Sequence, residues 1–85
     1  MEVLTLRDAK IGESYRVKRI SGQGAVKRRI MDMGLTKNAG FTVVKVAPLG
    51  DPVQIHLRGY QLSLRKQDAE MVQIEPIDAS EIEDN

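Results

Sequence analysis

Two short segments, VQIHLR (residues 53–58) and YQLSLR (60–65), limit the possible folds most, because apolar and polar residues alternate in both. A period of two places the apolar side chains on one face of an extended strand. Gly59 separates the two segments and predicts a tight connection between them. The residues expected to point inward are Val53, Ile55 and Leu57 in the first segment and Tyr60, Leu62 and Leu64 in the second.

Three further segments have the composition of strands. SYRVKRI (14–20) and VQIEPI (72–77) alternate in the same way. FTVVKVA (41–47) is rich in β-branched residues and apolar on both faces, so we expect both of its faces to be covered. The inward positions of the two alternating segments are Tyr15, Val17, Val72 and Ile74.

Residues 25–33, AVKRRIMDM, have a different period. Val26, Ile30 and Met33 recur with the spacing of one helix face, and Gly34 follows where a helix commonly ends. A helix of about ten residues is marginal on its own in water. We therefore expect it to pack against the strands.

Turn signals separate these segments. PLGDP (48–52) has the composition of a turn around Gly50, and Pro52 favours an extended backbone at Asp51. Five short strands with one helix between the first and second predict a mainly β fold that closes into a small barrel. We expect one domain over residues 1–76, followed by an acidic, disordered tail over residues 77–85.

The charge is unevenly distributed along the chain, and several kinds of site and segment are missing from the sequence. The chain has 85 residues and a net charge of +1, but residues 1–74 hold seven of the 12 acids and all 13 bases, a net charge of +6. No cysteine is present, so disulfides and thiolate metal sites are excluded. No apolar run approaches the roughly 20 residues that span a bilayer, and residues 1–10 lack a signal-peptide pattern.

No catalytic or cofactor-binding constellation is present in the sequence. His56 is the single histidine and the only candidate metal ligand of its type, on the expected outward face of its strand. One imidazole without thiols does not make a tetrahedral zinc site, which leaves only weak transition-metal binding open. No phosphate-binding motif or nucleophile–base pair is recognisable, so we expect neither an enzyme nor a bound cofactor.

Two kinds of binding protein remain from the residues alone. Six bases cluster in RVKR and VKRR (16–19 and 26–29), which suits a small nucleic-acid-binding barrel, but few aromatic residues are available for base stacking. The alternative is a protein-binding module. Its candidate surface is Lys27, Arg28 and Met31, on the helix flank opposite the apolar face.

Residues 4–76 resemble the FeoA family, the ferrous iron transport protein A family. The resemblance rests on the helix exit Met33-Gly34-Leu35, the strand Val43 to Ala47, the turn APLGDP and the later LSLRKQDAEMVQIE. The family usually has Pro-Gly in the turn after the helix exit, where this chain has Lys37-Asn38. Asparagine accepts a positive φ better than most residues, so we expect Asn38 to keep the turn.

The resemblance implies an SH3-like small barrel with an inserted helix. It also implies a cytoplasmic, non-enzymatic accessory of ferrous iron uptake that contacts the cytosolic portion of a FeoB-type, GTP-driven membrane transporter. It carries over no catalytic residues. Nucleic-acid binding and transition-metal sensing remain as alternatives.

Overall fold

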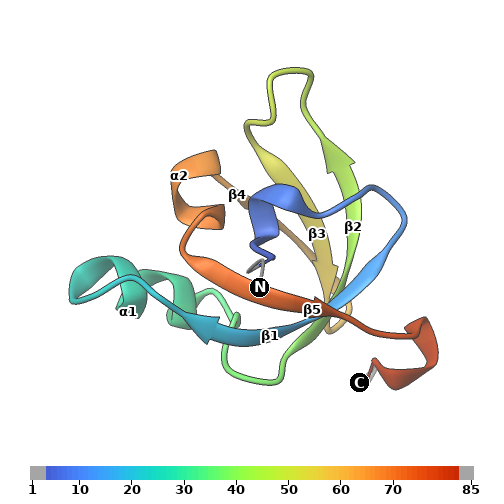
Figure 1. Ribbon diagram of the computed structural model, residues 1–85, viewed down its shortest axis with the longest axis horizontal. Helices are drawn as coiled ribbons and strands as arrows, with labels where there is room; N and C mark the ends of the chain where they lie inside the picture. The colour runs from blue at the N-terminus through green and yellow to red at the C-terminus, as the bar shows by residue number, and fades with distance from the viewer. Residues whose placement is uncertain (1–3, 83–85) are drawn as a thin grey trace.

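The computed structural model describes residues 4–82, which form five antiparallel strands and two α-helices (Figure 1). The sheet has the order β4-β3-β2-β1-β5, and α1 lies between β1 and β2 in the chain. This confirms the predicted mainly β fold. The elements are the 3-10 helix η1 (Leu6–Asp8), β1 (Ser14–Ile20), α1 (Ala25–Asp32), β2 (Gly40–Val46), β3 (Val53–Leu57), β4 (Tyr60–Leu64), α2 (Lys66–Ala69), β5 (Val72–Pro76) and the 3-10 helix η2 (Ala79–Glu81).

One face of the curved sheet carries the core. The predicted inward residues of β3 are each at most 1% exposed, and burial of a side chain of this size contributes about 1.5–3 kcal/mol. Three of the helices close the core, because each contributes a buried apolar side chain to the same cluster. These are Leu6 from η1, Ile30 from α1 and Ala69 from α2.

The sheet does not close into the barrel expected from the sequence. Among the described strands, β4 pairs only with β3, and β5 pairs only with β1. The N-terminal segment covers the other edge of β5: Thr5 forms a bridge with Gln73, and the N–H of Ile74 donates to the carbonyl of Leu4 at 2.9 Å. This pairing protects the β5 edge without closure against β4.

The expectation that both faces of residues 41–47 are covered is wrong. The pairing of β2 with β3 shifts register between Val43 and Lys45, so Val44 is the extra residue of a β-bulge and is 40% exposed. After the bulge Val46 pairs with Val53 and packs against the core. Phe41 and Val43 before the bulge and Val46 after it therefore face the core, while Val44 faces outward.

Tyr60 is also placed differently from the prediction. It was expected to point inward but is 44% exposed. Its hydroxyl donates a hydrogen bond of 2.6 Å to the carbonyl of Met33, just past the end of α1. The side chain thus links β4 to the helix exit instead of filling the core.

The acidic segment after Pro76 has more structure than expected. Asp78 caps η2, accepting hydrogen bonds of 3.1 Å from the N–H and the hydroxyl of Ser80. Ile77 and Ile82 lie against Gly40 at the start of β2. Disorder was expected from residue 77 onward, whereas residues 77–82 form a capped turn; residues 83–85 lie outside the described residues.

The positions proposed as turn residues lie between the regular elements. Gly34, Asn38, Gly50 and Gly59 have φ angles of 105°, 75°, 81° and 85°. Asp51 and Pro52 end the loop between β2 and β3, with a cis peptide bond between them. Asn38 also donates its N–H to the carbonyl of Val17 at 2.8 Å, so its turn is tied to β1.

Candidate partner-binding surface

A β-bulge near the end of β1 presents two adjacent basic side chains. The pairing of β1 with β5 shifts register between Val17 and Arg19, which leaves Lys18 as the extra residue. Lys18 and Arg19 are both exposed, and Ile20 turns back into the core. Simple alternation would have placed only one of the two bases outward.

The helix α1 lies beyond this end of β1 (Figure 1). Residues of β1, of α1 and of the link between them line a groove. Lys27 and Met31 are one helical turn apart and line the groove, while Ile30 of the same helix is buried in the core. Lys37, from the turn after the helix, also lines it. The groove has a volume of about 450 Å³. We call it the basic groove; its charged and apolar lining residues are Lys18, Arg19, Ile20, Lys27, Met31 and Lys37.

The structure divides the surface proposed from the sequence. Lys27 and Met31 share the basic groove, whereas Arg28 lines a separate hollow of about 480 Å³ on another side of α1. Asp32 and Arg29 lie in that second hollow with it. The three predicted side chains thus do not form a single site.

The bases of the basic groove form no ion pair within residues 4–82. Within residues 4–82, the ion pairs shorter than 4 Å join Arg7 to Glu70, Arg16 to Glu75 and Arg29 to Asp68. None of them involves a base of the groove, so no described carboxylate neutralises the groove at contact distance. The pKa of Arg16 is raised by its hydrogen bond to Glu75 and by the charge of that carboxylate.

Contacts in the last turn of α1 and at its exit hold the α1 side of the groove in place. Arg29 donates to the buried carboxylate of Asp68 in α2 at 2.7 Å. At the helix exit the hydroxyl of Tyr60 binds the carbonyl of Met33. Leu35, the next apolar residue, is completely buried. The helix is therefore fixed to α2, to β4 and to the core.

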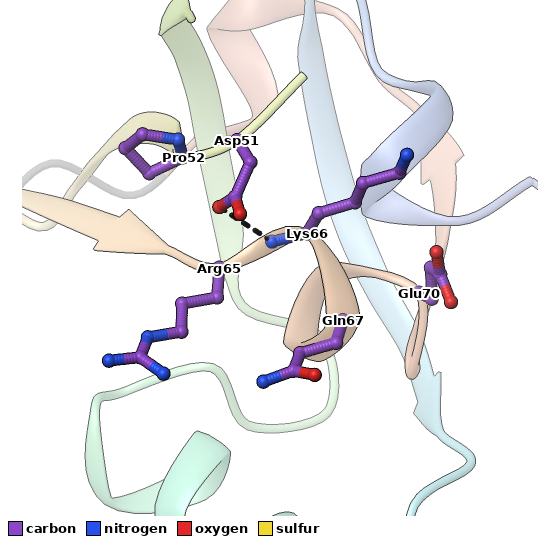
Figure 2. A pocket seen from close by; sticks show the side chains of 6 residues that line it. All are labelled: Asp51, Pro52, Arg65, Lys66, Gln67 and Glu70. Atoms are coloured by element: carbon purple, nitrogen blue, oxygen red, sulfur yellow. Dashed lines mark hydrogen bonds between the residues drawn. The ribbon is translucent and has the colours of Figure 1, made fainter. Parts of the chain in front are cut away.

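A third hollow lies beside α2 and is polar. Figure 2 shows its lining, which comes from the end of the β2–β3 loop and from residues 65–70, and its volume is about 690 Å³. The N–H of Lys66 donates to the carboxylate of Asp51 at 3.1 Å across it. Two acids and two bases line the hollow, so its formal charges balance. The lining residues are Asp51, Pro52, Arg65, Lys66, Gln67 and Glu70.

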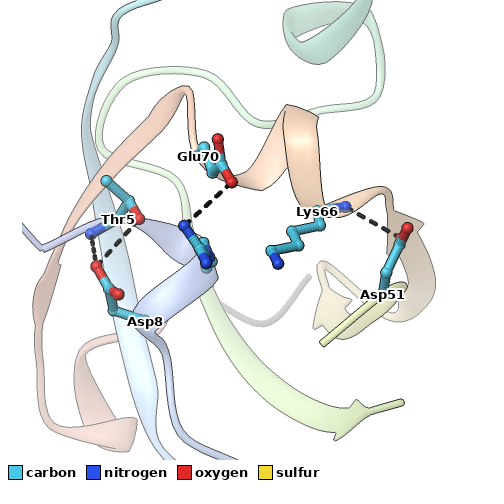
Figure 3. Close-up of polar contacts among 6 residues, drawn as sticks. Thr5, Asp8, Asp51, Lys66 and Glu70 are labelled. Atoms are coloured by element: carbon cyan, nitrogen blue, oxygen red, sulfur yellow. Dashed lines mark hydrogen bonds and ion pairs between the residues drawn. The ribbon is translucent and has the colours of Figure 1, made fainter. Parts of the chain in front are cut away.

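The carboxylates around α2 have structural partners. Arg7 of η1 forms an ion pair of 3.2 Å with Glu70, and Asp8 accepts hydrogen bonds from the N–H and hydroxyl of Thr5 (Figure 3). The Arg7–Glu70 pair ties the N-terminal segment to α2, and the Asp51–Lys66 contact ties the β2–β3 loop to it. They account for the polar residues here as connections between elements of the fold.

His56 does not lie in a cluster of metal ligands. It is exposed on β3, between Thr42 of β2 and Gln61 of β4. In the part of the chain that the structure describes, no three His, Asp or Glu side chains come close enough together to hold a metal ion. Across residues 4–82, no helix combines the length and the apolar composition needed to span a membrane.

Sequence reasoning from the helix alone missed part of the basic groove. Lys18 and Arg19 belong to the RVKR segment and had been grouped with the helix bases only as a general basic cluster. Lys37 had been considered only as a turn residue. The sequence signal was the break in alternation between Val17 and Ile20, where two consecutive bases separate two apolar residues, as the extra residue of a β-bulge allows.

Comparison with known families gives one match over most of the chain. The family model described as the FeoA domain matches residues 4–76. Among curated proteins, the chain is similar to an Fe(2+) transport protein A/Fe(2+) transporter FeoB fusion protein of Porphyromonas gingivalis, with 34% identity over 77 residues. That match covers 91% of this chain but spans only 9% of the length of the fusion protein.

Solved structures share the fold. The NMR structure of the FeoA-like protein from Clostridium acetobutylicum has a TM-score of 0.81 and 35% identity, over 91% of this chain and 90% of that one. The crystal structure of Stenotrophomonas maltophilia FeoA complexed with zinc, a procaryotic SH3 domain protein, has a TM-score of 0.73 and 22% identity, over 85% and 89%. The architecture is therefore SH3-like, with an open sheet.

Proposed function

Because the chain belongs to the FeoA family, which is associated with ferrous iron transport, we propose that it is a non-enzymatic accessory of ferrous iron uptake. It works in the cytoplasm, without a cofactor of its own, by binding the cytosolic portion of a FeoB-type transporter. The proposal has two parts: the partner, and binding in place of catalysis.

The observation that supports this partner is the fusion protein of Porphyromonas gingivalis. A segment similar to nearly the whole of this chain is there part of the same polypeptide as a FeoB transporter. Covalent linkage holds two modules at a high effective concentration, which is useful when they act on one another. We propose that this chain makes the corresponding contact between separate molecules.

Binding in place of catalysis fits the described side chains. Carboxylates beside α2 are engaged with Arg7 and with the N–H of Lys66, and the exposed His56 has no neighbouring ligand cluster within residues 4–82. The side of α1 that lines the basic groove has an exposed base, Lys27, and an exposed apolar side chain, Met31, instead. We propose this side of the helix as the contact surface.

A binding measurement with two purified proteins tests the proposal. The full chain is titrated with the cytosolic GTPase portion of the FeoB-type transporter of the same organism, and calorimetry or a pull-down reports the complex. We expect saturable one-to-one binding, and no binding to an unrelated GTPase domain used as the control. The absence of binding with and without guanine nucleotide would refute the proposed partner.

A further inference from the structure

We infer that the basic groove between the β1 bulge and α1 takes an acidic peptide segment of the transporter, with an apolar side chain of that segment seated against Met31. This inference rests on the proposed function and specifies the chemistry of the partner. It also selects one side of α1, so that Lys27 contacts the partner and Arg28 does not.

Charge complementarity supports an acidic occupant. Bases reach the groove from three separate parts of the fold: the bulge supplies Lys18 and Arg19, the helix supplies Lys27, and the following turn supplies Lys37. No ion pair of the described chain involves these residues, so an incoming carboxylate displaces no internal partner. Oppositely charged surfaces accelerate association and select the partner.

The apolar part of the groove supports a peptide over a small anion. Met31 is 41% exposed, although Ile30 beside it is completely buried, and Ile20 contributes to the floor. A methionine side chain adapts to apolar groups of different shapes. A free phosphate would use the bases alone, whereas an acidic segment with an apolar residue uses both kinds of lining.

A protein segment also fits better than a nucleic acid strand. Proteins hold single-stranded nucleic acids by stacking the nucleobases on aromatic side chains, and no aromatic residue lines the groove. The ring of Tyr60 belongs to β4, and its hydroxyl is bonded to the carbonyl of Met33. RNA binding is kept as a separate outcome of the test.

The test compares two double charge reversals that change the net charge equally. Lys18→Glu with Lys27→Glu places acids in the groove, while Arg28→Glu with Lys45→Glu places them outside it. All four side chains are exposed, so both variants should fold, which circular dichroism and a urea melt will check. We expect the groove variant to bind the transporter portion at least about tenfold more weakly, and the control variant to stay within about threefold of wild type.

Two further measurements separate the parts of the inference. Met31→Ser should weaken binding by a factor that changes little with salt, whereas the effect of the charge reversal should shrink as salt rises. A synthetic peptide of glutamates around one leucine should shift the amide resonances of residues 18–23 and 27–31, and a glutamate peptide without leucine should bind more weakly.

Each outcome decides between the proposals. If wild type binds the transporter portion and both double reversals bind equally well, the groove is wrong and the proposed function stands. If wild type does not bind the transporter portion, both fall. Stronger binding of single-stranded RNA than of the acidic peptide at about 200 mM salt would overturn the choice of a protein segment.

Discussion

Substitution of Gly34 by alanine should destabilise the protein through two separable effects. Gly34 ends α1 with φ at 105°, which a residue with a Cβ adopts only under strain. A Cβ built at this position would also lie 2.5 Å from the hydroxyl oxygen of Tyr60 and 3.1 Å from Cδ2 of Leu57. The hydroxyl cannot move away freely, because it is bonded to the carbonyl of Met33 at 2.6 Å.

The magnitude follows from these two effects. The backbone strain costs about 1–2 kcal/mol. Loss of the hydrogen bond from Tyr60 to Met33 adds about 0.5–1.5 kcal/mol, and displacement of Leu57 adds to it. We therefore expect Gly34→Ala to lower the free energy of unfolding by about 2–4 kcal/mol. That is a large part of the stability of a domain of this size.

Gly50 provides a matched control for the backbone effect. Its φ is 81°, and a Cβ built there meets nothing within 4 Å. Gly50→Ala should thus carry the backbone strain alone and cost about 1–2 kcal/mol. The difference between the two alanine variants in urea unfolding measures the steric effect at the helix exit.

A double-mutant cycle tests whether the hydroxyl of Tyr60 is the obstacle. Tyr60→Phe removes the oxygen that a Cβ at position 34 would approach, so Gly34→Ala should cost less when combined with Tyr60→Phe than in wild type. If Gly34→Ala costs no more than Gly50→Ala, or if its cost is the same with and without Tyr60→Phe, the steric argument is refuted.

Three other perturbations test the core, the helix anchor and the C-terminal turn. Leu57→Ala should cost about 2–5 kcal/mol in a urea melt, because Leu57 is completely buried, and a change near zero would mean that its face of β3 is not the core face. Asp68→Ala should cost about 1–3 kcal/mol and speed hydrogen exchange in α1, because it removes the partner of Arg29; unchanged exchange in α1 would argue against this anchor. Hydrogen bonds from Ser80 lower the pKa of Asp78 from its ordinary value of 3.8. The η2 turn should therefore be fully stabilised above pH 3.8 and lose that stabilisation as the pH falls through the lower pKa of the folded state. The amide shift of Ser80, followed by NMR across this pH range, will report the change. A shift of Ser80 that titrates above pH 3.8 would contradict this cause.

Local sequence patterns predict most of the strands and the helix. The alternation in residues 53–57 and 72–76 gives the correct inward faces, because the extra residue of each bulge lies in the partner strand, β2 or β1, and not in these segments. The apolar spacing from Val26 to Met33 gives the helix and its buried side, and Gly34 marks its exit. In these segments the local pattern and the packing agree.

The features that sequence did not predict depend on distant contacts. The bulge at Val44 exists because β2 changes register against β3, which no period within β2 reveals. Tyr60 leaves the core for a hydrogen bond to a carbonyl 27 residues earlier in the chain. The sheet stays open because Leu4 and Thr5, from the opposite end of the chain, reach the edge of β5.

The same limit applies to the candidate site. Lys27 and Met31 could be grouped from helical spacing alone. The separation of Arg28 from them, and the arrival of Lys18 and Lys37 beside them, follow from how α1 lies against the end of β1. The sequence thus predicted a basic surface with an exposed methionine, whereas the set of residues that lie together in it followed only from the tertiary structure.

The most direct test is a map of the contact surface by NMR. Isotope-labelled chain is titrated with the unlabelled cytosolic portion of the FeoB-type transporter, and amide shift changes are followed at each residue. We predict that the largest changes fall at residues 18–23, 27–31 and 37. Changes confined to the hollow beside α2, at residues 51–52 and 65–70, or no changes at saturating partner, would contradict binding through the basic groove.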